Sequence, residues 1–329
     1  REDGTHWTTN ISVEVDESFF ECYIEGYKWA RDVMKAVVLG KRLNGEPGFW
    51  NRSLAMKGER DPELMFCPNP CGEIGLQMWE NCNLGHVNLG YFVKRPKAEM
   101  LEAFRLMTRW LIRATNGDIP QKRQREVVDR NCRIGVGLFG YHERVARNGI
   151  KYSKSWESEM VRTRLKDAFA QVSMEAAVYA IQLGKPIPVK NTALAPTGTI
   201  VMMAGTTPSG QAMPAVWFRR LVRYSNMDPR LAVKREEGFE VIPDDDAPNT
   251  SIVISWCEDP LASKMQAAGW PIDELECQYD IPFEDSLKVQ TMFQELYADN
   301  SISFTINMTP ERVPSEEEME RLLFNYLPG

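Results

Sequence analysis

The chain has 329 residues, 43% hydrophobic and 26% charged, as in a globular protein with a sizeable core. Its net charge of −7, from 39 basic and 46 acidic residues, argues against a nucleic-acid groove as the main surface. No apolar run approaches the roughly 20 residues that span a bilayer, and the first residues do not resemble a signal peptide.

Strands and helices are predicted in alternation along the first half of the chain. Residues 10–15 alternate and are β-branched, which indicates a short strand. Residues 28–40 and 97–114 carry apolar side chains at helical spacing, so each predicts a helix. The basic, polar stretch 121–133 leads from the second helix into a glycine-rich segment.

The second half continues this alternation. The longest predicted helix has Ser155 as its N-cap and ends at Gly184. The acidic, proline-bounded stretch 239–248 is expected to be a solvated loop. The remaining predictions are a strand over 251–257, a helix over 286–297, a half-buried strand over 301–308 and a last helix capped by Ser315. Strands that alternate with helices predict an α/β fold, here one domain over residues 1–329.

The loop 67–88, CPNPCGEIGLQMWENCNLGHVN, concentrates three of the seven cysteines. Asn69, Cys71 and Glu73 alternate, so in an extended or finger-like loop their side chains project to one side. That arrangement sets a thiol between an amide and a carboxylate. Cys82 follows eleven residues after Cys71, close enough to return to the same pocket if the chain turns back.

The same loop allows a second interpretation, a structural zinc site. Cys67, Cys71 and Cys82 supply three thiols, and His86 could be a fourth ligand. Zinc sites prefer a C-x2–4-C pair with a second pair of Cys or His at hand, so a zinc-stapled, non-catalytic module is kept as an alternative. Glu80, the second carboxylate of the loop, is interpreted as ordinary polar surface.

The cysteines as a set indicate a reducing compartment. Seven is an odd number, and their spacings show no disulfide framework. Reduced thiols and a cytoplasmic location are therefore expected. The cysteines outside the loop are interpreted as packed thiols: Cys22, Cys132, Cys257 and Cys277.

The pattern Gly135-x-Gly137-x-x-Gly140 matches the glycine fingerprint of dinucleotide-binding folds. Polar residues precede it where that fold requires a strand. We therefore expect the glycines to serve close backbone packing. A nicotinamide dehydrogenase remains an alternative that a measured lack of NAD binding would remove.

The segment 195–200, Ala-Pro-Thr-Gly-Thr-Ile, lacks the lysine of a P-loop. Its small residues nevertheless allow backbone N–H groups to converge on an anion. The glycine-bounded segment 205–210 is expected to be a flexible, polar loop. The aromatic and basic run 217–224 is assigned to a strand or an interface, because the chain as a whole is acidic.

These motifs together resemble a known family. N-P-C-G-E at 69–73 and E-x-C-N-L-G-x-V-N-L at 80–89 resemble the finger loop of ribonucleotide reductases. The glycine pattern that follows Arg133, the segment 195–200 and the segment 299–308 occur in the order that family requires. The eleven-residue cysteine spacing is similar to that of its adenosylcobalamin-dependent branch, class II. The resemblance implies a ten-stranded α/β barrel with the finger loop inside, of which this chain supplies only the later part.

The resemblance also implies a chemistry, the reduction of ribonucleotides to 2′-deoxyribonucleotides for DNA synthesis with adenosylcobalamin as cofactor. By resemblance, Cys71 carries the thiyl radical, Glu73 is the general base and Asn69 orients the sugar. Cys82 is then one of two thiols that become a disulfide, which a dithiol or thioredoxin-type reductant restores. The substrate phosphates would lie on a turn made by Pro196, Thr197, Gly198 and Thr199.

The chain departs from the family pattern at the second redox cysteine. The family carries that residue on a strand far upstream of the loop, and no cysteine here occupies such a place. Cys22 stands only 49 residues before Cys71 and is interpreted as core. The chain also begins on Arg1. A split or incomplete half-enzyme, active only with an amino-terminal or homodimer partner, is therefore a further alternative. Nucleotide effectors in this family bind mostly in segments absent here.

Overall fold

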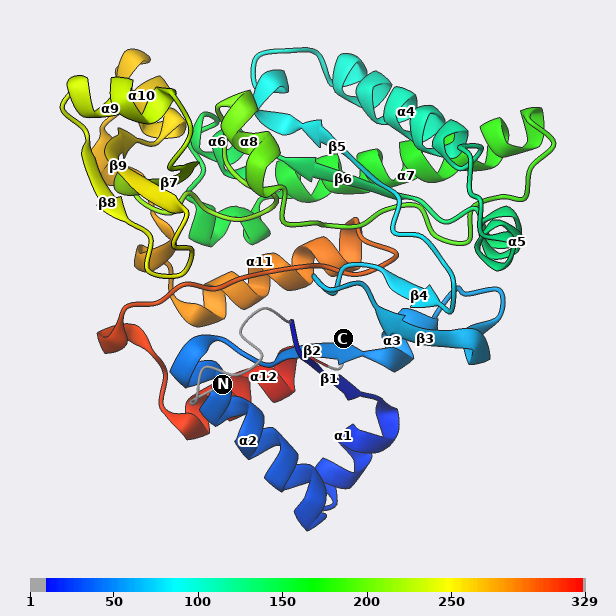
Figure 1. The fold of residues 1–329 in the computed structure, drawn as a ribbon. Coiled ribbons are helices and arrows are strands. Elements are labelled where there is room, and N and C mark those ends of the chain that lie inside the picture. The colour runs from blue at the N-terminus through cyan, green and yellow to red at the C-terminus, as the bar shows by residue number, and fades with distance from the viewer. Residues whose placement is uncertain (1–9, 328–329) are drawn as a thin grey trace.

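The computed structural model describes residues 10–327, which form three groups of elements (Figure 1). Parallel strands lie against the long helices α4 and α7, and elements from both ends of the chain form a second group. An antiparallel sheet with two short helices stands at one side. Helix α11 (Phe283–Leu296) crosses between the first two groups in Figure 1 and confirms the helix predicted over 286–297.

Parallel strands form the centre of the first group. Strands β5 (Leu84–Asn88) and β6 (Gly135–Phe139) pair along their full length. Every residue of β6 is buried, as expected for a parallel strand covered on both faces. Two isolated parallel bridges extend the row to segments further along the chain: Val136 with Thr192, and Leu194 with Ile302.

The predicted strand over residues 301–308 is wrong beyond its start. Ser303 donates its N–H to the carbonyl of Leu194 at 2.8 Å, but residues 304–308 have no regular structure. Phe304 still packs on the main core, whereas Met308 packs on the core of the second group. The segment leaves the sheet because it crosses from one core to the other.

Two long helices cover the parallel strands. Helix α4 (Lys97–Ala114) has the predicted bounds, and α7 (Glu159–Gln182) packs along it through ion pairs such as Lys97 to Asp167 at 2.5 Å. The N-cap of α7 is Ser158, so the prediction of Ser155 is wrong. Ser155 is buried in a preceding 3₁₀ turn, where its hydroxyl donates to the carbonyl of Tyr152 at 2.7 Å.

Helix α5 (Lys122–Asn131) lies in the stretch to which the sequence assigned no element. The side-chain oxygen of Gln121 caps it by accepting the N–H groups of Arg123 and Gln124. Only Val127, Val128 and Asn131 are buried. Three buried positions are too few to produce a visible apolar period, because the rest of the helix is charged and exposed.

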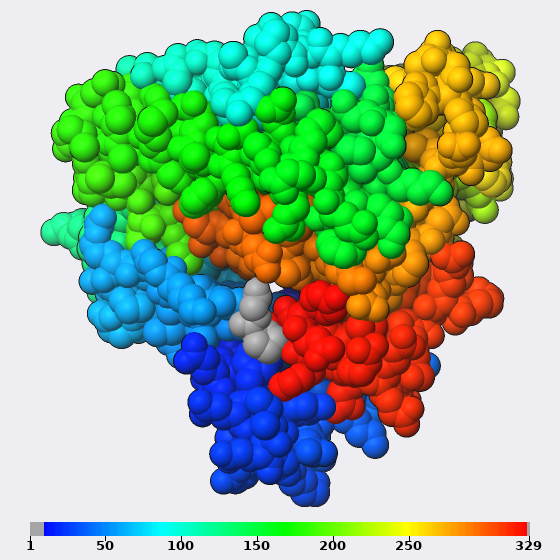
Figure 2. Space-filling view, turned by 180° about the vertical axis from the view of Figure 1, so that it is seen from behind, coloured from blue at the N-terminus to red at the C-terminus, as the bar shows by residue number. Residues whose placement is uncertain are grey.

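The two ends of the described chain meet in the second group. Figure 2 shows the last helix (red) against the first helices (blue). Phe20 and Tyr23 contact the ring of Phe324, and the Ser315 hydroxyl accepts the N–H of Glu318, which confirms the predicted cap. The elements are β1 (Ser12–Val15), α1 (Glu17–Ile24), α2 (Lys28–Asn44), β2 (Gly48–Asn51) and α12 (Glu316–Tyr326), with β1 parallel to β2.

The antiparallel sheet has the strand order β7–β9–β8. The run 217–224 is a strand, as predicted, and so is 251–257. The expectation of a solvated loop over 239–248 is wrong, because β8 lies within it and Asp244 is buried against the guanidinium of Arg223 at 2.6 Å. The bounds are β7 (Trp217–Ser225), α9 (Arg230–Glu236), β8 (Glu240–Pro243), β9 (Thr250–Glu258) and α10 (Pro260–Ala267).

The α/β prediction is confirmed, whereas the strands of residues 10–327 form four small sheets and no closed barrel. Within those residues we find no helix long and apolar enough to cross a membrane. Five shorter elements complete the fold: α3 (Arg52–Met56), β3 (Met65–Pro68), β4 (Gly75–Gln77), α6 (Tyr141–Ala146) and α8 (Gly198–Ala204).

Candidate active site

Residues 69–74 form the tip of a hairpin whose arms are β3 and β4, which pair antiparallel. The N–H of Gly72 donates to the carbonyl of Asn69 at 2.9 Å, and the N–H of Asn69 donates to the carbonyl of Ile74 at 2.8 Å. Gly72 has a φ of 86°, which a residue with a Cβ rarely adopts. Ile74 is fully buried and anchors the tip in the core. The loop is therefore finger-like, as the sequence predicts.

Asn69 connects the tip of the finger loop to Cys82, which follows β4 in the chain. Its side-chain oxygen accepts the N–H of Ile74 at 3.0 Å, and its Nδ2 donates to the Sγ of Cys82 at 3.6 Å. The first bond fixes the orientation of the amide, because only the oxygen can accept. The amide nitrogen therefore faces Cys82, which lies in the segment 80–83 between β4 and β5 (the cysteine arm).

Glu73 is a buried carboxylate with one unsatisfied oxygen. Its side chain is 1% exposed, and its Oε2 has no hydrogen-bond partner among the described residues. Burial raises the pKa of Glu73, and a hydrogen bond from Asn69 opposes that shift. Its backbone carbonyl accepts the N–H of Ser301 at 3.0 Å. A buried, unpaired acid beside thiols is typical of a functional site.

The thiols of Cys71 and Cys82 share this environment. Burial, followed by the charge of Glu73, raises the pKa of Cys71. Burial, then Glu73, then Cys71 raise the pKa of Cys82 to about 12. Both therefore remain protonated thiols at neutral pH, which suits hydrogen-atom transfer and not thiolate attack. The structure thus brings Asn69, Cys71, Glu73 and Cys82 together, as predicted.

A cavity of about 480 Å³ opens beside Cys82. Cys82 is an exposed residue beside this cavity, and burial is nevertheless the largest cause of the raised pKa of its thiol. The cavity lies between the cysteine arm and the turn that joins α4 to α5. Its lining includes Asn81, Cys82, Asn83, Thr115, Asp118 and Arg133.

The segment 195–200 forms the start of helix α8. Thr197 has a left-handed φ of 53° and its hydroxyl oxygen accepts the N–H of Ser209 at 2.8 Å. Gly198 and Thr199 are exposed, and Pro196 is half-buried. The segment continues from Leu194, whose backbone pairs with residues 301–303 beside Glu73. The turn therefore follows directly on an isolated β-bridge whose partner segment contacts Glu73.

The glycine segment serves close packing, as predicted. A Cβ on Gly135 would lie 2.5 Å from Leu84, and one on Gly137 would lie 2.4 Å from His86. Gly135 and Gly137 lie inside β6, not in a turn between a strand and a helix. The geometry of a dinucleotide-binding turn is therefore absent from this segment, and the dehydrogenase alternative loses its basis.

The segment 205–210, expected to be a flexible loop, is instead packed. Thr206 and Thr207 are buried, and the hydroxyl of Thr206 donates to Glu143 at 2.6 Å. Lys264 pairs with the same carboxylate at 2.6 Å. This contact ties the segment after α8 to helices α6 and α10.

Glu80 is not ordinary polar surface. Its side chain is 1% exposed, and its Oε1 accepts the Nε–H of Arg133 at 2.9 Å. Sequence reasoning missed this because the partners are far apart in the chain. The available signal was the position of Arg133, a cation immediately before a fully apolar run.

The zinc alternative finds no ligand set in the structure. Residues 10–327 contain no group of three or more His, Cys, Asp or Glu side chains that could hold a metal ion. His86 is half-buried on β5 and its Nε2 has no partner within that range. Burial alone lowers its pKa to about 4.

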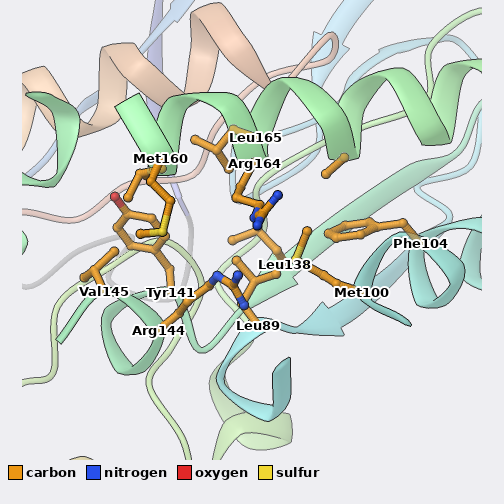
Figure 3. Close-up of a pocket in the computed structure, with 12 residues that line it drawn as sticks. Leu89, Met100, Phe104, Leu138, Tyr141, Arg144, Val145, Met160, Arg164 and Leu165 are labelled. Atoms are coloured by element: carbon orange, nitrogen blue, oxygen red, sulfur yellow. The ribbon is translucent and has the colours of Figure 1, made fainter. Parts of the chain in front are cut away.

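A second pocket lies under helices α4, α6 and α7 (Figure 3). Its volume is about 20 Å³, room for about one water molecule. Figure 3 shows Arg144 and Arg164 among apolar side chains such as Phe104 and Leu165. Burial, with a contribution from the Arg164 charge, lowers the pKa of Arg144. The pocket is too small for a substrate.

The model of the ribonucleotide reductase barrel domain matches residues 7–187 of the chain. The chain belongs to the ribonucleotide reductase family. This confirms the resemblance drawn from the finger loop, and a barrel-type fold follows from it.

The chain is 37% identical to a putative adenosylcobalamin-dependent ribonucleoside-triphosphate reductase of Mycobacterium phage D29, over 94% of this chain and 47% of that protein. It is 25% identical to an adenosylcobalamin-dependent ribonucleoside-triphosphate reductase of Levilactobacillus brevis, over 97% and 43%. The chain thus spans about half the length of these curated relatives.

Solved structures share the fold. A B12-dependent, class II ribonucleotide reductase superposes with a TM-score of 0.78 at 23% identity, over 99% of this chain and 46% of the other. The class Id α subunit of Actinobacillus ureae superposes with a TM-score of 0.70 at 17% identity, over 97% and 63%.

Proposed function

We propose that this ribonucleotide reductase chain carries the catalytic loop of an adenosylcobalamin-dependent, class II enzyme. Its reaction converts ribonucleotides to 2′-deoxyribonucleotides for DNA synthesis, in the cytoplasm. The observation that carries the proposal is the convergence of Asn69, Cys71, Glu73 and Cys82, with one oxygen of the buried Glu73 left without a partner. A 3′-hydroxyl is the donor that this oxygen lacks.

The chemistry begins when the Cys71 thiol loses a hydrogen atom. The thiyl radical takes the hydrogen atom from C3′ of the ribose, and Glu73 accepts the proton of the 3′-hydroxyl. The 2′-hydroxyl then leaves as water with one thiol hydrogen of the pair formed by Cys82 and a second cysteine, and C2′ takes the other thiol hydrogen as the pair becomes a disulfide. Asn69 orients the sugar through the amide hydrogens that face the cysteine arm. At the end Cys71 returns its hydrogen atom to C3′, and Glu73 returns the proton to the 3′-oxygen.

The two electrons of the reduction come from Cys82 and a second thiol, which join as a disulfide. A dithiol or thioredoxin-type reductant restores the pair by thiol–disulfide exchange. Cys22 is not that second thiol, because it packs in the core of the terminal group. By resemblance to the family, whose second cysteine lies far upstream of the loop, we assign the partner cysteine to an amino-terminal half of the enzyme or to another subunit.

The residues present fit the proposed cofactor in one respect that the structure allows us to test. Cys71 is an exposed residue and its pKa is raised, so it remains a protonated thiol that a radical cofactor can approach. Adenosylcobalamin, when bound, supplies carbon-centred radical chemistry of the kind that breaks such a bond. Cys71 is the residue that must lie against it.

The phosphates of the substrate bind the turn made by Pro196, Thr197, Gly198 and Thr199. Support comes from its two exposed residues, its left-handed Thr197 and its place after the bridge of Leu194 to the segment that contacts Glu73. Backbone N–H groups at such a turn favour an anion. The names of the relatives favour a triphosphate as the first substrate to test. Nucleotide effectors would bind the segments of the relatives that this chain does not span.

The deciding experiment measures cobalamin-dependent reduction of a ribonucleoside triphosphate with a dithiol, using this chain alone and mixed with an amino-terminal half from the phage relative. We expect activity in the mixture, and its loss in Cys71→Ala. The matched control is Cys67→Ala, an exposed thiol on β3 to which we assign no role. Equal activity of both variants, or none with folded protein and bound cobalamin, would overturn the proposal.

A further inference from the structure

A neutral cluster of four buried charges lies at the base of the finger loop. The guanidinium of Arg133 donates two bonds of 2.7 Å to Glu59 and one of 2.9 Å to Glu80. The ammonium of Lys190 lies 3.7 Å from Glu59. All four side chains are at most 4% exposed. Two cations balance two anions, so each charge depends on the others.

Glu80 attaches the cysteine arm to this cluster. Its Oε2 accepts the N–H of Gln77 at 2.8 Å, and its Oε1 accepts from Asn131 at 2.9 Å as well as from Arg133. Residues 80–83, between β4 and β5, have no regular secondary structure. The carboxylate therefore supplies part of the order that a strand would otherwise give to the residues next to Cys82.

Arg133 also reaches the other side of the site. Its Nη1 donates to the side-chain oxygen of Asn300 at 3.2 Å. The next residue, Ser301, donates its N–H to the carbonyl of Glu73 at 3.0 Å. One guanidinium thus links the arm that carries Cys82 to the segment that holds Glu73.

Cys82 itself is held weakly. The hydrogen bond to its sulfur comes from Asn69 at 3.6 Å, and the cavity of about 480 Å³ adjoins it. A thiol beside so much open space requires a tether elsewhere in its segment. We propose that the Glu80–Arg133 pair is that tether, and that Glu80 is a positioning residue that holds Cys82 against Cys71 and Glu73.

The proposal makes the reactivity of Cys82 a measure of its position. In place, its pKa is about 12 because of burial, Glu73 and Cys71. If the tether is cut, the thiol can move into the cavity, and its pKa falls toward the ordinary value near 9. At pH 8 the thiolate fraction then rises by up to about a thousandfold, partly offset by lower nucleophilicity.

The test compares Glu80→Gln with Glu59→Gln in the 329-residue chain. Both variants remove one negative charge from the same cluster. Glu59 makes the larger contact with Arg133, through two hydrogen bonds against one from Glu80, but only Glu80 belongs to the cysteine arm. Mass spectrometry follows iodoacetamide labelling of Cys82 and Cys71 between pH 7 and 10. We expect Glu80→Gln to label Cys82 at least tenfold faster at pH 8, and Glu59→Gln to stay within about twofold of the original chain.

Equal labelling of Cys82 in the two variants would overturn the proposal, because the cluster would then be structural only. If either glutamine variant does not fold, Glu80→Asp is compared with Glu59→Asp as its control. Each of these variants keeps the negative charge and shortens the side chain by one methylene group. The role in turnover rests on the proposed function, and labelling does not. Faster labelling without reductase activity in any chain would refute the proposed function alone, whereas activity that survives Glu80→Gln with unchanged labelling would refute the positioning role alone.

Discussion

The Nδ2 of Asn69 lies 3.6 Å from the Sγ of Cys82, while the oxygen of the same amide accepts the N–H of Ile74 at 3.0 Å. One side chain thus joins the tip of the finger loop to the cysteine arm. The amide nitrogen donates to the sulfur of Cys82, and the Oε2 of Glu73 has no hydrogen-bond partner among residues 10–327. A buried carboxylate oxygen without a partner lowers the stability of the fold, and it is available to accept a hydrogen bond from a substrate.

Glu73→Gln should stabilise the folded chain while it removes activity. The pKa of Glu73 is raised in the fold, so its ionised form is disfavoured there. The unfolding free energy of the original chain therefore falls as pH rises from the unfolded pKa through the folded one. We expect the variant to gain in Tm relative to the original at pH 8 and to match it near pH 4. Reductase activity of the complemented enzyme should fall about a hundredfold or more. A Tm difference that does not change with pH would contradict this.

Gly198→Ala should separate phosphate binding from stability. A Cβ at Gly198 would meet nothing within 4 Å, and the position lies in the first turn of α8. Alanine should therefore leave the unfolding free energy unchanged or raise it by up to about 1 kcal/mol. If the phosphates approach this backbone, the methyl group weakens binding of a ribonucleoside triphosphate by about tenfold or more, measured by calorimetry. Undiminished affinity would remove Gly198 from the site.

Gly140→Ala should be among the more damaging glycine substitutions. Its φ is +70°, and a Cβ there would lie 2.6 Å from the Oδ1 of Asn88 and 2.8 Å from the backbone nitrogen of Gly90. Strain and overlap together should cost about 3 kcal/mol or more in urea unfolding. Gly184→Ala is the control, because its φ of +64° is similar but nothing lies within 4 Å. That variant should lose only about 1 kcal/mol. Similar losses in both would show that the overlap at Gly140 relaxes freely.

Asp259→Asn should stabilise the chain above pH 6. Asp259 caps α10 by accepting the N–H of Leu261 at 2.8 Å, and burial raises its pKa to about 6. The charged form is disfavoured in the fold, so stability is lost as pH rises from about 4 to 6. An asparagine oxygen keeps the cap without the charge, and the gain should reach at most about 3 kcal/mol at pH 8.

The control for this prediction is Asp16→Asn, at the cap of α1. Asp16 accepts the N–H of Phe19 at 2.8 Å, but a hydrogen bond from Ser18 is the main cause of its lowered pKa. The charged form is favoured there, so stability is present above the unfolded pKa and lost as pH falls through the folded one. The asparagine variant should lose stability at pH 8. Urea unfolding at pH 5 and pH 8 measures both variants, and changes of the same sign would contradict the argument.

The elements with strong local signals were predictable from the sequence. Helix α4 repeats apolar residues over its whole length. Ser315 precedes three glutamates at the start of α12, and its side chain accepts the N–H of Glu318. The candidate site residues of the finger loop were equally predictable, because Asn69, Cys71 and Glu73 lie within five residues of one another and their residue types indicate the chemistry. These features depend on neighbours in the chain.

The tertiary structure alone decided which polar groups are buried. Glu80 has the sequence surroundings of a surface residue, but Arg133 and Asn131 reach it from a distant segment and donate to its carboxylate, and its side chain is buried. The segment 301–308 alternates like a strand, yet it crosses between two cores and leaves the sheet after Ser303. Hydrogen bonding and desolvation depend on which segments meet in space. The local sequence therefore indicates the chemistry of this loop, whereas only the tertiary structure shows that Arg133 links the cysteine arm to the segment beside Glu73.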